Sequence, residues 1–143
     1  MTAEGFYQTL LASLTKNFSR ENSKLLDFYL DGVKATVTMT TNAGVTVTAN
    51  SVGTAGNNLR FAVASVAAAT AGVTVATVSG VTTITASLTA AAKTIGDLKA
   101  LIASNPTANA LVTITGTDAT AVAAEVTAVA LAGGSTTGVI LEE

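Results

Sequence analysis

The residues that most often carry out chemistry in proteins are scarce in this chain of 143 residues. It contains no His, no Cys and no Trp, which excludes His-based acid–base catalysis, a Cys nucleophile, a disulfide and a zinc site with nitrogen or sulfur ligands. Ser and Thr are abundant, but no His is present to activate them as nucleophiles. We therefore expect a protein that is not an enzyme and that uses no cofactor and no metal.

One cluster of small and polar residues, at positions 51–58, could bind a ligand through its backbone. It contains Gly53-x-x-Gly56, whose N–H groups could face a phosphate. A phosphate loop, however, leads into a helix and carries a Lys, whereas a strand-like segment follows here and Arg60 is the nearest base. In the alternative, structural interpretation the glycines allow a sharp turn, and Asn57 and Asn58 bond the backbone of their own loop.

The acidic residues form no pattern typical of a metal or catalytic site. None of them fits the calcium-loop spacing D-x-[DN]-x-[DN]-G. Asp27 and Asp31 lie four residues apart on one face of an expected helix, but Lys24 and Lys34 are near enough to pair with them. We interpret these residues as a solvated face and Glu142-Glu143 as a charged tail.

The composition indicates a folded domain with an unusually small number of charges. Charged residues make up 11% of the chain, against about 25% in an average soluble protein. Seven basic residues are outnumbered by nine acidic ones and do not cluster, which disfavours nucleic acid as a partner. We see no apolar run of membrane-spanning length and no signal peptide, so we expect no membrane association. A surface so poor in charge favours coverage by other subunits in an assembly.

Residues 1–34 differ from the rest of the chain and are predicted to form an N-terminal helical arm. They hold eight of the 16 charges, and an apolar residue recurs every fourth position from Phe6 to Phe18, as in an amphipathic helix. A second helical segment follows Ser19 and ends near Gly32. Either these helices pack on the chain's own β-domain, or they bind a neighbouring subunit through aromatic anchors. The candidate partner-binding residues are Phe6, Tyr7, Phe18, Phe28 and Tyr29.

Residues 35–143 are predicted to form a β-rich domain because the hydrophobic period changes from about four to two. A helical period returns only at 95–102, where Thr94 and Asp97 resemble a capping box and Asn105-Pro106 ends the helix. Residues 117–131 fit either an Ala-rich helix capped by Asp118 or a strand. The expected class is α+β: an antiparallel or mixed sheet with one packed helix, preceded by the helical arm. Strands are expected at 33–40 and 45–47, joined as a hairpin, and at 59–66, 73–78, 81–88, 111–115 and 125–131, with a tight turn at 78–81.

Several short motifs occur in a distinctive order between residues 45 and 138, about two thirds of the chain. In this order the stretch resembles a β-rich module of structural proteins of tailed bacteriophages, including parts of contractile-tail sheath subunits and virion surface proteins. It differs in having Ala55 where an aromatic residue often precedes the Gly-Asn pair, and it is far too short for a complete sheath. The motifs are Thr48-Ala49-Asn50, Gly53-x-x-Gly56-Asn57-Asn58, strands near 73–75 and 81–84, a helix at 95–103 followed by Ala110-Leu111-Val112, and Leu131-Ala132-Gly133-Gly134-Ser135.

The resemblance implies a non-enzymatic protein of the virion, assembled in the host cytoplasm. The first hypothesis is a capsid decoration or cement protein that binds the major capsid protein and other copies of itself as a homo-oligomer. The second is a tail component: a tube, sheath-associated or fibre-attachment subunit. A third, a carbohydrate-binding module on a fibre, would need an exposed aromatic residue in the β-rich part, where Phe61 is the only candidate.

Overall fold

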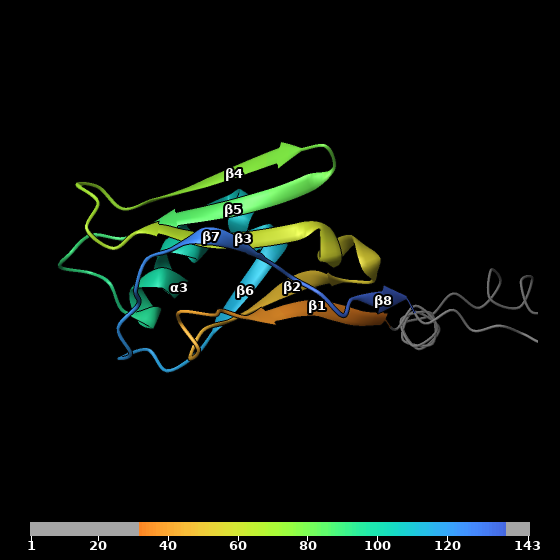
Figure 1. The fold of residues 1–143 in the computed structure, drawn as a ribbon, viewed down its shortest axis with the longest axis horizontal. Coiled ribbons are helices and arrows are strands. Elements are labelled where there is room, and N and C mark those ends of the chain that lie inside the picture. The colour runs from red at the N-terminus through yellow and green to blue at the C-terminus, as the bar shows by residue number, and fades with distance from the viewer. Residues whose placement is uncertain (1–31, 137–143) are drawn as a thin grey trace, which may run out of the picture. The chain divides into compact units, whose positions relative to one another are not determined.

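A computed structural model describes residues 32–136, which form eight strands in two four-stranded sheets together with short helices (Figure 1). The strand order is β6-β2-β1-β8 in the first sheet and β4-β5-β3-β7 in the second. The domain is therefore β-rich with one main helix, in agreement with the expected α+β class. In chain order the elements are β1 (Gly32–Thr38), β2 (Thr46–Val52), the 3-10 helix η1 (Thr54–Asn58), β3 (Leu59–Ser65), β4 (Gly72–Val78), β5 (Val81–Ser87), α3 (Ile95–Ser104), α4 (Pro106–Leu111), β6 (Val112–Thr115), β7 (Glu125–Ala130) and β8 (Ser135–Thr136).

The expected hairpin near the start of the β-rich part is confirmed as the antiparallel pair of β1 and β2 in the first sheet. Val37 lies opposite Val47, and the strand begins at Gly32, slightly before the expected domain start at 35. Val33 is 55% exposed, although it alternates in step with the buried Ala35 and Met39. The register of β1 against β2 shifts between Lys34 and Thr36, which interrupts the alternation of the strand there.

The second sheet is mixed, and its outer hairpin has the predicted tight turn. Ser79 and Gly80 both have positive φ angles, 51° and 80°, as a two-residue turn that follows the strand twist requires. The chain then places β5 between β4 and β3, with β5 parallel to β3, while β7 pairs antiparallel with the other side of β3.

Helix α3 begins and ends where the sequence predicts, but a second short helix follows it. Thr94 and Asp97 form the capping box, with Asp97 N–H donating to the Thr94 hydroxyl at 3.2 Å and Thr94 N–H donating to the Asp97 carboxylate at 2.9 Å. Asn105 ends α3 and also caps α4, since its side-chain oxygen accepts from Ala108 N–H at 3.0 Å. The sequence Asn105-Pro106 thus ends one helix and begins the next.

The helix alternative for residues 117–131 is wrong. Residues 117–124 form turns and loop, and a strand begins at Glu125. The backbone in this region pairs with residues at the start of α3: Ile95 N–H donates to Thr120 O at 2.9 Å, and Val122 N–H donates to Lys93 O at 2.8 Å. These long-range bonds give hydrogen-bond partners to backbone N–H and C=O groups, which in a helix would have bonded to neighbours along the chain.

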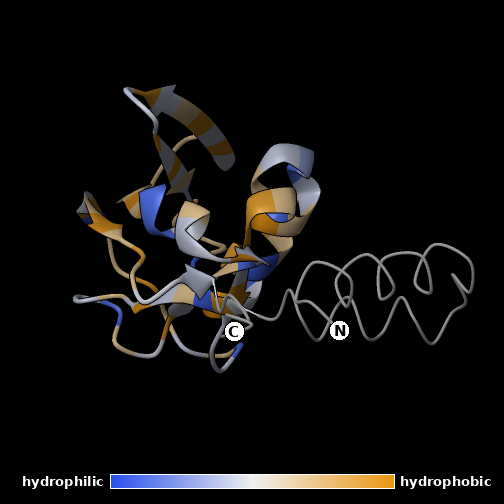
Figure 2. Cartoon of the chain, turned by 90° about the vertical axis from the view of Figure 1, so that its right-hand side faces the viewer, coloured by the Kyte–Doolittle hydropathy of each residue, from blue (hydrophilic) through white to orange (hydrophobic). Residues whose placement is uncertain are grey.

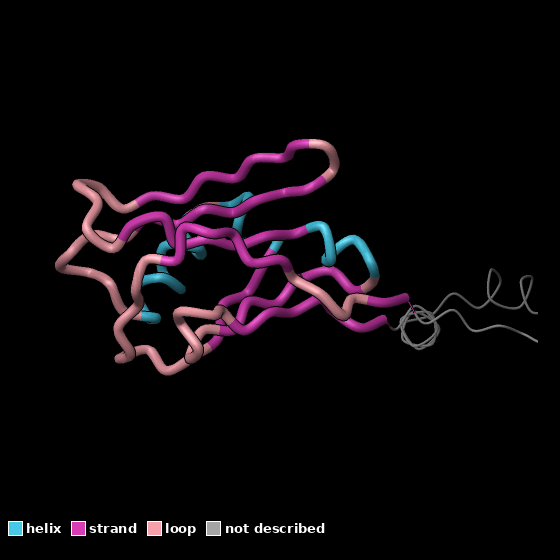
Figure 3. Tube along the Cα trace, in the orientation of Figure 1, coloured by secondary structure: helices cyan, strands magenta, loops and turns pink. Residues whose placement is uncertain are grey.

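Both sheets and α3 contribute to a single hydrophobic core. Phe61, Ile84 and Leu98 are fully buried in it, and nineteen buried residues between positions 35 and 131 form one cluster. Figure 2 shows the hydropathy of these elements, and Figure 3 shows that the loops after β3, β5 and β6 lie at the same end of the domain. Gly32–Ser135 forms one compact unit.

Candidate functional site

Glu125 is the only buried residue with an ionisable side chain in the part of the chain that the structure describes. It is the first residue of β7, and 7% of its surface is exposed. A charged group in such a place either has a chemical role or is held by several hydrogen-bond donors. Its surroundings therefore decide which of the two roles it has.

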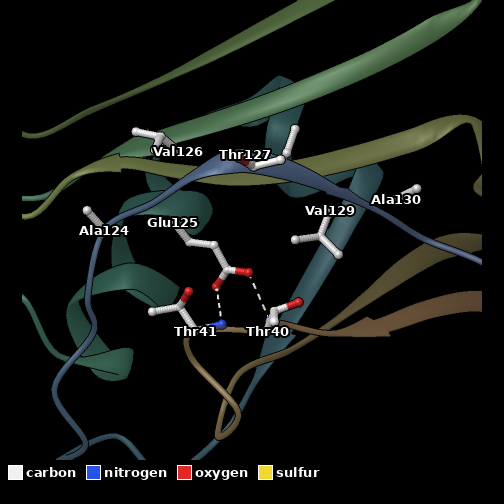
Figure 4. Close-up of a pocket in the computed structure, with 9 residues that line it drawn as sticks. Thr40, Thr41, Ala124, Glu125, Val126, Thr127, Val129 and Ala130 are labelled. Carbon is white, nitrogen blue, oxygen red and sulfur yellow. Dashed lines mark hydrogen bonds between the residues drawn. The ribbon is translucent and has the colours of Figure 1, made fainter.

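The Glu125 carboxylate is surrounded by donors from the loop between β1 and β2. One oxygen accepts from Thr40 N–H at 2.9 Å, and the other accepts from Thr41 N–H at 3.0 Å and Asn42 N–H at 3.3 Å. Figure 4 shows the side chain pointing toward Thr40 and Thr41. The Asn42 side-chain amide adds a fourth donor at 3.2 Å. The negative charge is thus stabilised by backbone dipoles and an amide, without a basic side chain.

Asn42 completes this connection between the two sheets. Its amide nitrogen donates to Ala123 O at 3.0 Å, and its side-chain oxygen accepts from Ala123 N–H at 2.7 Å. Asn42 and Glu125 together fix the hairpin loop of the first sheet to the start of β7 in the second. We conclude that Glu125 is a structural anchor, since its carboxylate oxygens are already occupied by four donors.

A shallow groove of about 540 Å³ lies beside this anchor. It is lined by Thr40, Thr41 and residues 124–130, that is, by β7 along its length. The lining side chains are Thr, Ala and Val apart from Glu125, whose carboxylate points to the hairpin loop (Figure 4). The groove therefore offers van der Waals contact and no reactive group.

The glycine-rich cluster at 51–58 serves the fold. Gly53 has φ 96°, and its N–H donates to Val33 O at 3.1 Å. A Cβ on Gly56 would lie 2.8 Å from the Cβ atoms of Ala35 and Ala49, so only glycine fits there. The geometry thus favours the turn interpretation over the phosphate interpretation.

The expected role of Asn57 within its own loop is wrong. Its amide nitrogen donates to Gly134 O at 2.9 Å, and its side-chain oxygen accepts from Gly134 N–H at 2.8 Å. This pair of bonds fixes the turn to the segment between β7 and β8, 77 residues further along the chain. The local sequence could not indicate so distant a partner.

Among the remaining charged groups of the domain, Lys99, Asp118 and Asp97 have identified partners. Lys99 forms an ion pair with Asp118 at 2.6 Å, so Asp118 does not cap a helix as one alternative required. Hydrogen bonds from the backbone N–H and the hydroxyl of Thr94 lower the pKa of Asp97 below its ordinary value.

Residues 32–136 contain no group of three or more acidic, His or Cys side chains placed to hold a metal ion. Within the same segment no helix is long and apolar enough to span a bilayer.

The candidate partner-binding residues Phe6, Tyr7, Phe18, Phe28 and Tyr29 lie outside the described residues. Phe61 is fully buried, so it cannot stack on a sugar, and the carbohydrate hypothesis loses its candidate in the β-rich part.

The anchoring roles of Asn42 and Glu125 were not predicted from the sequence. The available signal was weak: Glu125 is the one charged residue between Asp118 and Glu142.

Comparison of the chain with family models, with curated proteins and with solved structures finds no match.

Proposed function

We propose that this chain is a non-enzymatic structural protein of a bacteriophage virion, and specifically a capsid decoration or cement protein. The observation that carries the proposal is a long stretch without charge: residues 61–92 contain no Asp, Glu, Lys or Arg. This stretch supplies β4, β5 and most of β3. A protein that works free in solution keeps charges on such strands, whereas a subunit covered by its neighbours does not need them.

The place of the motifs in the fold supports a role based on shape. Two motifs that carry the phage resemblance meet each other, since Asn57 of the Gly53-Asn58 turn bonds both backbone groups of Gly134. The conspicuous polar side chains, Asn42, Asn57 and Glu125, all hold backbone segments together. Their arrangement favours a rigid module for protein contacts over a module for chemistry.

The proposed partners are the major capsid protein and other copies of this chain, in a homo-oligomer that follows the local symmetry of the lattice. The N-terminal arm would supply the anchors to the capsid, with Phe6, Tyr7, Phe18, Phe28 and Tyr29 as contact residues. In this proposal the protein resides in the virion, which is assembled in the host cytoplasm.

The test is to add the purified chain to particles of the phage that encodes it, prepared without this chain, and to analyse them by cosedimentation and electron cryomicroscopy. We expect added density at symmetry-related positions on the capsid surface. Density on the tail would contradict the capsid assignment and indicate a tube, sheath-associated or fibre-attachment subunit. A chain that binds no part of the particle would overturn the virion proposal.

A further inference from the structure

Strand β4 is an exposed edge of the second sheet. It pairs with β5 along all seven of its residues without a register shift, and Figure 1 shows no described element on its other side. Five of its seven residues are exposed, and Val78 is exposed to 72%. A regular, unpaired edge strand of this length is a template for another strand.

Two of the other sheet edges, β6 and β7, are protected in ways that β4 is not. β6 has only four residues, which leaves little edge to pair. β7 is irregular where it meets β3, and it carries the inward-pointing carboxylate of Glu125. β4, with the sequence GVTVATV, has no charge, no Pro and no bulge. In Figure 2 this topmost strand alternates between orange and pale bands.

The turn geometry shows which backbone groups of β4 face outward. Val78 and Val81 flank a two-residue turn and therefore form a hydrogen-bonded pair, and such pairs alternate along the ladder. Val73, Val75 and Thr77 consequently direct their N–H and C=O groups away from β5. The Asn105 amide does reach the outward carbonyl of Val73, at 3.3 Å. The outward groups of Val75 and Thr77 have no backbone partner among residues 32–136.

The segment around Ala76 is complementary to itself. If two copies meet in antiparallel orientation about this residue, Val75 of each lies opposite Thr77 of the other, and Ala76 lies opposite Ala76. All four outward N–H groups then find an outward carbonyl. The half-buried faces of the two sheets stay on the same side, because opposite residues share a face. No charge on either strand opposes the contact.

We propose that this chain self-associates by antiparallel pairing of the β4 edges of two copies, so that two four-stranded sheets become one sheet of eight strands. The inference goes beyond the proposed function, because it assigns the surface through which copies meet and rests on the sheet geometry alone. A single strand pair buries much less than the roughly 1,600 Å² of a standard stable interface, so we expect a dissociation constant weaker than about 1 μM. Such a contact becomes strong only when it is repeated in an assembly.

The first test is sedimentation velocity of the full chain over a concentration series, with the variants Ala76→Lys and Thr83→Lys. Ala76 and Thr83 are directly opposite neighbours on β4 and β5. Lys at 76 brings two ammonium groups together across the junction and should raise the dissociation constant roughly tenfold or more. Lys at 83 places the same charge on β5, one strand away from the junction, and should change the dissociation constant much less. A wild-type chain that stays monomeric, or equal effects of the two variants, would overturn the proposal.

The second test remains informative if Lys at 76 disturbs the hairpin. Because the chain has no Cys, a single Ala76→Cys variant can form a disulfide only between two copies. Under mild oxidation we expect Ala76→Cys to give a covalent dimer and the matched Thr83→Cys to remain monomeric. The same low yield of dimer from both variants would contradict β4 pairing. A chain that binds particles but shows no β4 dimer would overturn this inference and leave the proposed function standing.

Discussion

At the scale of single residues, Glu125 and Phe61 acquire their roles only from distant partners. The donors to Glu125 belong to residues 40–42, more than 80 positions earlier in the chain. The sequence predicts that a strand begins at about 125, but the type of residue there does not predict burial, because most Glu side chains are exposed. The sequence offers Phe61 as the only candidate for an exposed aromatic residue in the β-rich part, but the structure buries it completely.

Replacing Glu125 by Gln should lower the free energy of unfolding by about 2 kcal/mol. Gln keeps one accepting oxygen, while its amide nitrogen would face backbone N–H donors that then lack a partner in a buried place. Chemical denaturation followed by circular dichroism measures the change. Asp118→Asn is the matched control, because Asp118 is a surface partner of Lys99 with 73% of its side chain exposed, and it should change stability by less than about 1 kcal/mol. Equal effects of the two substitutions would refute the anchoring role.

At the scale of elements, local patterns predicted most of the strands and the main helix. The strands expected at 73–78 and 81–88 are found within one residue, because β-branched alternation and a Ser-Gly turn are local signals. Helix α4 was not predicted, because Asn105-Pro106 is equally typical of the end and of the start of a helix. The helix is also only six residues long, too short for a helical period to show in the sequence. The division into two sheets and the parallel pairing of β3 with β5 depend on contacts that no local pattern specifies.

The capping box of α3 predicts a stability change that depends on pH. Thr94→Ala removes the hydroxyl that accepts from the first turn, which should cost about 1 kcal/mol at pH 7. The folded-state pKa of Asp97 lies below the ordinary 3.8, so its contribution is present above that value and disappears as the pH falls through the lowered pKa. The Thr94 backbone N–H, the larger cause of the lowered pKa, is kept in Thr94→Ala, but the hydroxyl, the second cause, is lost. The part of the stability difference between wild type and Thr94→Ala that depends on the hydroxyl should therefore narrow in acid.

Thermal denaturation of wild type and Thr94→Ala, at neutral pH and in acid, measures how this difference in stability changes with pH. Ser104→Ala at the other end of α3 serves as the control, since Ser104 donates only to the Leu101 carbonyl and touches no titratable group in the described segment. Its effect on the melting temperature should be the same at both pH values. A Thr94→Ala difference that stays constant across the acid range would show that Asp97 is not coupled to the cap.

At the scale of the whole molecule, the described domain is organised around one hydrophobic core. The nineteen residues of the core cluster come from positions 35–131, and both sheets and α3 take part. The bonds of Glu125 and Asn57 each join segments more than 70 residues apart, so we expect the domain to unfold as one cooperative unit. The composition changes near residue 34, close to the first residue of β1, and the helical arm predicted before it lies outside the described residues.

Deleting residues 1–31 tests whether the β-rich domain and the N-terminal arm have separate tasks. Since β1 begins at Gly32 and the nineteen residues of the described core cluster all lie at 35–131, we expect the truncated chain to keep its β-sheet circular dichroism and a cooperative unfolding transition. The β4 edge is unchanged, so dimer formation through Ala76→Cys should also persist. Attachment to the capsid should be lost if Phe6, Tyr7, Phe18, Phe28 and Tyr29 are the anchors. A full-length chain with these five residues replaced by Ala should then bind as poorly as the truncated chain. Loss of the cooperative transition on truncation would instead place the expected helices in the core of the β-rich domain.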